Sequence, residues 1–146
     1  MIIRAEKGDL ADALNSISLP EDALVFVANS EVSDEWTAVL DELTAAYELS
    51  QTAVRAGGPI VYLVDGDDLL GRRGAGSAMV ACGLLSAARS LALETSRAGV
   101  PVNVIASGAG MTHVSLRSWI ELLCGLGSPN GELIRLGADH LGKALP

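Results

Sequence analysis

The stretch Gly76–Gly108, GSAMVACGLLSAARSLALETSRAGVPVNVIASG, contains the elements that decide the fold. Small residues with interspersed leucines dominate Ala75–Ala98 and predict a long helix with few polar positions. Such a helix is usually covered by more than its own sheet, which indicates a helix-on-helix interface with another subunit. Val100–Ala106 (VPVNVIA) is continuously apolar rather than alternating, which is typical of a strand covered on both faces of a parallel sheet.

Further strands and helices are predicted on both sides of this stretch. Three more apolar runs indicate buried strands, at Leu24–Asn29, Pro59–Asp65 and Glu132–Leu136. A helix is expected from Ser33, as the N-cap, to about Ala56, and another over Leu116–Leu126. The first of these carries apolar residues at helical spacing, namely Trp36, Val39, Leu40, Leu43, Ala46 and Tyr47.

Strands that alternate with helices imply βαβ units with right-handed crossovers. We therefore predict the α/β class, with three layers, a mainly parallel sheet and helices on both faces. The 146 residues are enough for one domain, and no linker or repeat divides residues 1–146.

The composition excludes several classes of partner. The formal charge of −8 disfavours nucleic acid, and no polybasic patch would attract anionic lipid. We expect no membrane span, because no stretch reaches about 18 apolar residues, and the N-terminus has no signal-peptide core. Cys82 and Cys124 lie in apolar, helix-like contexts, so we interpret both as buried free thiols in a reducing, cytoplasmic protein.

Several segments, taken in order, resemble the short-chain dehydrogenase/reductase (SDR) family. Arg89–Glu94 (RSLALE) and Val102–Gly108 (VNVIASG) are similar to the helix and strand that follow the catalytic residues of an SDR. Asp22–Ser30 (DALVFVANS) and Glu35–Val54 resemble an earlier strand and helix, and GELIRLGADHLGKALP resembles the last strand and tail. The resemblance implies a Rossmann-like fold that is truncated at the N-terminus.

The family's glycine-rich turn, which holds the pyrophosphate of a dinucleotide, has no counterpart. Gly8 is the only glycine among the first 21 residues, so we expect no bound dinucleotide cofactor. Gly71, Gly74 and Gly76 form a cluster with two arginines, but it lies outside the strand–turn–helix context of a phosphate cradle. We interpret it as a solvated loop. The missing strands also leave Leu24–Asn29 at a sheet edge, which Met1–Arg4 is expected to cover as a substitute strand, with a helix at Asp9–Ile17 over one face.

The resemblance also places the family's catalytic positions on unsuitable residues. The tyrosine falls on Ser77, the lysine on Ala81, the serine on Asp65 (or on Val64 in a shifted register) and the asparagine on Glu42. We therefore expect no catalytic residues, no cofactor site and no metal site. Thr112 matches the loop that contacts the nicotinamide in the family, and we interpret it as part of a turn retained for the fold.

These observations favour a non-catalytic SDR-like protein that assembles with itself or with an intact SDR subunit, whose pocket the tail Gly137–Pro146 would shape. An alternative is an enzyme with non-redox or residual oxidoreductase activity, in which Asp65, Ser77, Glu42 and His113 converge on the remnant pocket. A third interpretation is a structural protein with no partner.

Overall fold

A five-stranded parallel sheet forms the centre of the computed structural model, which describes residues 1–5, 8–127 and 129–138. The strands lie in the order β1-β2-β3-β4-β5. Their bounds are Ile2–Arg4, Leu24–Val27, Ile60–Asp65, Val102–Ser107 and Leu133–Leu136. The α/β class and the four predicted apolar strands are therefore confirmed, and every described pairing is parallel.

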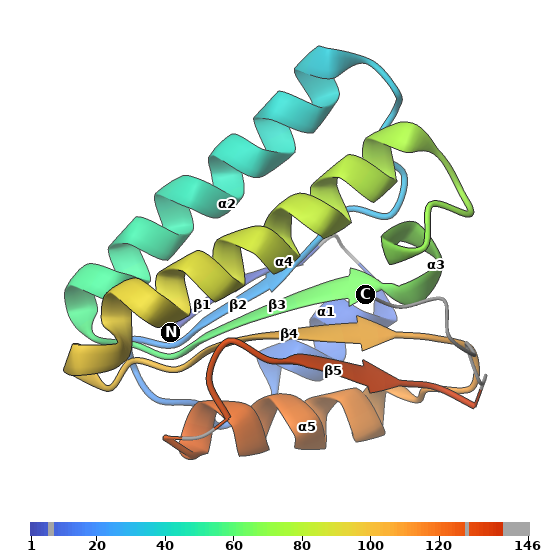
Figure 1. The fold of residues 1–146 in the computed structure, drawn as a ribbon. Coiled ribbons are helices and arrows are strands. Elements are labelled where there is room, and N and C mark those ends of the chain that lie inside the picture. Colours follow the sequence, from blue (N-terminus) through green and yellow to red (C-terminus); the bar gives the residue numbers. More distant parts are fainter. Residues whose placement is uncertain (6–7, 128, 139–146) are drawn as a thin grey trace.

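Helices cover both faces of the sheet (Figure 1). Two long helices, α2 (Trp36–Ala56) and α4 (Ala75–Thr95), lie on one face, and α4 continues into the 3-10 turn Ser96–Ala98. The shorter α1 (Asp9–Asn15) and α5 (His113–Gly125) pack together on the other face. Two apolar clusters result, one on each side of the strands. A single turn of helix, α3 (Gly66–Leu69), follows β3.

The crossovers between strands differ in hand, so the prediction of right-handed crossovers throughout is wrong. All four connections step in the same direction across a parallel sheet. Connections through α1 and α5 pass over the face opposite to α2 and α4, so these two pairs must have opposite hands. At the β1 edge, Arg4 contacts Glu42 of α2 on one face of the sheet, and α1 packs on the other.

The substitute first strand is present. Ile2, Ile3 and Arg4 pair with Leu24–Phe26 of β2, as the sequence predicted. The Arg4 guanidinium donates to the Val27 carbonyl oxygen at 2.7 Å and lies over the Phe26 ring, 4.7 Å from its centroid. On the α1 face the fully buried Leu14 supports the same edge. The strand is thus fixed by a side-chain anchor as well as by backbone pairing.

Several local expectations for α2 and the cysteines are wrong. Helix α2 begins at Trp36 with Glu35 at its N-cap, so Ser33 does not cap it. Tyr47, one of the apolar residues at helical spacing, is 63% exposed, because α4 and the sheet cover a different side of α2. Cys82 is exposed and only Cys124 is buried. Burial raises the pKa of the Cys124 thiol to about 12, which keeps it protonated and unreactive.

Among the described residues, one helical segment is long and apolar enough to cross a membrane by length and composition alone. This segment, Ala75–Ala98, has a mean hydropathy of 1.4 over its most apolar window. In the fold, its residues Val80, Leu84 and Ala88 are buried against the sheet and α2. The helix of a buried core meets the same criteria as a membrane span, because both need apolar residues over many turns.

Candidate functional site

The carboxyl ends of the strands form the polar edge of the molecule. A hollow of about 370 Å³ lies at the ends of β3, β4 and β5. Its charged lining comes from Asp65 at the end of β3, Asp67 in α3, Arg72 after α3 and Arg135 in β5. Ligands of open α/β sheets bind at this edge, so it is the candidate site.

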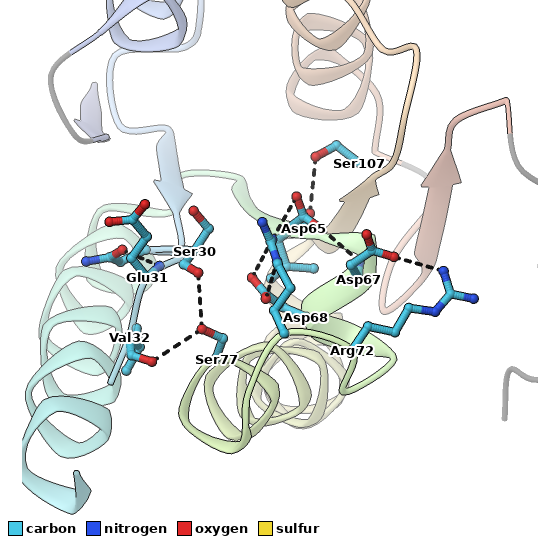
Figure 2. A network of polar contacts seen from close by, with 12 residues as sticks. Ser30, Glu31, Val32, Asp65, Asp67, Asp68, Arg72, Ser77 and Ser107 are labelled. Carbon is cyan, nitrogen blue, oxygen red and sulfur yellow. Dashed lines mark hydrogen bonds and ion pairs between the residues drawn. The ribbon is translucent and has the colours of Figure 1, made fainter. Parts of the chain in front are cut away.

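A carboxylate–guanidinium cluster occupies the β3 side of this edge. Arg73 forms two hydrogen bonds of 2.9 Å with the Asp68 carboxylate and an ion pair of 2.8 Å with Asp65. The Asp65 carboxylate also accepts from the Asp67 N–H at 2.8 Å and so caps α3 (Figure 2). The Asp65 carboxylate, which stands at the expected position of the family's serine, is therefore fixed by contacts with Arg73 and the Asp67 N–H.

Burial dominates the electrostatics of Asp68. It raises the pKa of the carboxyl, and the hydrogen bond and charge of Arg73 lower it only in part. For Arg73, burial lowers the pKa, but the hydrogen bond with Asp68 and the charges of Asp65 and Asp68 outweigh it, so the net shift is upward. The segment Asp65–Asp68 is thus not a wholly solvated acidic turn, because Asp68 is buried.

The glycine cluster after α3 serves packing. A Cβ on Gly76 would lie 2.2 Å from the Ser33 carbonyl oxygen, so only glycine fits there. The Gly76 N–H donates to the Asp34 carboxylate at 2.7 Å, which places a carboxylate at the N-terminus of α4. Arg72 pairs with Asp67 at 2.9 Å, and both side chains are exposed. These contacts neutralise the positive groups that a phosphate would need.

The expected tyrosine and lysine positions, Ser77 and Ala81, lie on α4. The Ser77 hydroxyl points toward the carbonyl oxygens of Ser30 and Val32, at 3.2 and 3.4 Å (Figure 2). Ala81, one turn further, is buried in the apolar core. The phenol of Tyr62 bonds to Ser50 beneath α2, and burial raises its pKa against the lowering effect of Ser50. No described tyrosine replaces the missing acid.

Glu42 forms a second polar contact that serves the fold. Its carboxylate takes two hydrogen bonds from Arg4, at 2.6 and 2.5 Å, and accepts from the Asn29 N–H at 2.8 Å. The side chain is only 7% exposed. Glu42 therefore joins α2, β1 and the loop after β2, and these contacts leave it little capacity to act on a ligand.

The four residues of the enzyme alternative line no common cavity among the described residues. Asp65 lines the hollow at β3–β5, Glu42 lines another between α2 and β1, and His113 lines a third at the ends of β1 and β2. Ser77 lines none of these hollows. Their predicted convergence is not seen.

The residues that the structure describes before and in α1, from Gly8 onward, do not fit the diphosphate of a dinucleotide. Only Gly8 stands before α1, and the first turn of this seven-residue helix carries Asp9 and Asp12. Their carboxylates repel an anion where the family needs backbone N–H groups. Thr112, the retained loop residue, caps α5 by accepting from the Ser115 N–H at 3.2 Å.

Sequence reasoning missed Arg73, Asp68 and Arg4 as the side chains that organise these contacts. The available signal was charge order: two arginines follow an Asp-Gly-Asp-Asp run within a few residues. For Arg4 the sequence carried no such local signal, since its partner Glu42 lies 38 positions away.

Solved dehydrogenases share this architecture. Acetoin dehydrogenase from Enterobacter cloacae is 20% identical, with a TM-score of 0.64 over 80% of this chain and 62% of that one. A 4-hydroxyisoleucine dehydrogenase, solved with NADH and succinate, is 22% identical, with a TM-score of 0.66 over 80% and 66%. The 3-hydroxyacyl-CoA dehydrogenase type-2 from Mycobacterium avium is 18% identical, with a TM-score of 0.66 over 82% and 67%.

The fold is that of these dehydrogenases. The SDR-like architecture inferred from the sequence is therefore confirmed at the level of the fold. The chain spans 62% of the length of the acetoin dehydrogenase and 66% of the 4-hydroxyisoleucine dehydrogenase. Neither a protein-family model nor a curated protein sequence matches it.

Proposed function

We propose that the chain is a non-catalytic, SDR-like protein, a pseudoenzyme that acts by assembling with itself or with an intact SDR subunit. The observation that carries the proposal is at the start of α4. Ser77 and Ala81 stand at the expected acid–base positions, the serine hydroxyl is directed to backbone carbonyls, and the alanine is buried. Hydride transfer to a carbonyl needs a proton donor near the reacting oxygen, and neither residue supplies one.

The outer surface of α2 and α4 supports the assembly part of the proposal. Trp36, Leu40 and Tyr47 lie on one stripe of α2, at spacings of four and seven residues, and each is at least 46% exposed. Met79 and Leu93 of α4 add apolar surface, with Leu93 79% exposed. Exposed aromatic and aliphatic residues on neighbouring helices mark protein-binding surfaces.

We take residues 1–146 as one SDR-like domain and the cytoplasm as its location. The segment of the tail proposed to reach a partner's pocket, residues 139–146, lies outside the described part of the chain.

Two measurements on the purified chain test the proposal. Light scattering after size exclusion should give a mass above that of one 15.0 kDa chain, alone or after co-expression with SDR genes from the same source. Titration of NADH and NADPH, followed by nucleotide fluorescence, should show no saturable binding. A chain that stays monomeric under both conditions would remove the assembly claim, and tight nucleotide binding would remove the claim of lost catalysis.

A further inference from the structure

The hollow at the ends of β3, β4 and β5 carries charges of both signs on its walls. From β3 the chain passes to α4 on one face, and from β4 it passes to α5 on the other, so the hollow lies where the crossovers diverge. Ligands of open parallel sheets bind at such points. Its volume of about 370 Å³ lies within the usual range of small-molecule sites.

Arg135 is the cation of this hollow with the least compensation. It extends from the exposed position of β5, and no carboxylate in the described ranges forms an ion pair with it. Arg72, also in the lining, is held by Asp67 in a solvent-exposed pair. Exposed pairs contribute at most about 1 kcal/mol, so Arg72 can exchange Asp67 for another carboxylate. A guanidinium binds carboxylates with two parallel hydrogen bonds.

The same hollow contains negative groups that limit the ligand. Asp65 and Asp67 belong to its lining, and the whole chain has a formal charge of −8. A simple anion would be repelled by these carboxylates, whereas a molecule with a cationic group at its other end would be attracted by them. Arg73 shields Asp65 only in part, because it divides its contacts between Asp65 and Asp68.

We propose that this hollow binds a small zwitterion of the amino-acid class, whose carboxylate contacts Arg135 and whose ammonium faces Asp65 and Asp67. The inference concerns binding without chemistry, and it does not depend on the assembly proposed above. It gives a non-catalytic protein a ligand that its polar edge recognises.

Chemical-shift titration of the 146-residue chain tests this site. The probes are glycine, 4-aminobutyrate and 6-aminohexanoate, with butyrate and butylamine as singly charged controls. We expect one amino acid of the series to bind more tightly than both controls, with shifts at the backbone N–H groups of Gly66, Gly108 and Gly137. If either control binds as tightly as every amino acid, or if no probe shifts these signals at about 10 mM, the proposal is wrong.

Variants assign the binding to Arg135. Arg135→Gln should weaken the zwitterion at least about tenfold, because a charge-assisted hydrogen bond is lost. Arg135→Lys should retain part of the affinity, since it keeps the charge but not the planar fork. The control Arg89→Gln changes an exposed arginine on α4 outside the hollow and should leave binding unchanged. Unchanged affinity in Arg135→Gln, with the fold intact by circular dichroism, would contradict the assignment.

Discussion

The carboxyl edge of the sheet and the outer face of α2 and α4 differ in whether their side chains have partners within the chain. At the edge, Glu42, Asp65 and Asp68 are each paired with an arginine of the same chain. On the helix face, Trp36 and Tyr47 remain more than 60% exposed. These three carboxylates are thus paired within one chain, whereas the apolar face has surface that a second protein would cover. We therefore assign assembly to the exposed apolar face of the helices, and only ligand binding to the charged edge.

The largest expected effect comes from breaking the pairing at the edge. Glu42→Ala leaves the partly buried Arg4 guanidinium and the Asn29 N–H without their acceptor, and should lower the free energy of unfolding by about 3 kcal/mol. Urea denaturation measures this change. Glu48→Ala, at an exposed position of the same helix, should change it by less than about 0.5 kcal/mol. Equal effects of the two variants would show that the Arg4–Glu42 contact does not stabilise the first strand.

The helix face should respond in assembly rather than in stability. Tyr47→Glu places a charge on the exposed stripe, at its most exposed residue, and should weaken self-association, or association with an SDR partner, by about 2 kcal/mol, roughly 30-fold. Analytical ultracentrifugation over a range of concentrations measures the change. Thr52→Glu lies on the polar side of α2 and should leave the association constant unaltered. If Tyr47→Glu unfolded the chain instead, the stripe would belong to the core and the comparison would fail.

A smaller effect is expected where α4 meets the loop before α2. Gly76→Ala forces a methyl group to within 2.2 Å of the Ser33 carbonyl oxygen and should destabilise the chain by about 2 kcal/mol, because the backbone before α2 must shift. Gly125→Ala, where nothing lies within 4 Å, should be neutral or slightly stabilising. Thermal unfolding of the two variants makes the test. Equal melting temperatures would show that the loop yields freely.

The sequence predicted β2, β3 and β4 well because their burial on both faces leaves a continuous apolar run, as in Ile60–Asp65. It misjudged α2 because that helix has two apolar stripes. Val39 and Ala46 face the sheet, whereas Leu40 and Tyr47 face outward, and periodicity does not say which stripe is covered. The four-residue helix α3 was missed because it depends on capping by Asp65, a contact too local to give a periodic pattern.

At the site, the sequence located the residues that replace the family's catalytic tyrosine and lysine, but not the residues that these contact. Ser77 and Ala81 were located by resemblance, whereas their surroundings depend on contacts with residues such as Ser30, 47 positions away. The proposed convergence of Asp65, Ser77, Glu42 and His113 required relative positions that only the three-dimensional arrangement gives. The sequence showed acidic residues followed by Arg73, but it did not show that the Arg73 guanidinium contacts both Asp65 and Asp68.

The change of hand between crossovers bears on the order in which the chain folds. The segment from β2 to β4 contains two connections of the same hand on one face, and its central pairing, β3 with β4, extends over six residues. The first and last strands are connected through helices on the opposite face, α1 and α5. Each of these strands adds a pairing of only three or four residues. We therefore expect the middle of the chain to form the folding nucleus, with both ends docking afterwards and opening first in native-state hydrogen exchange.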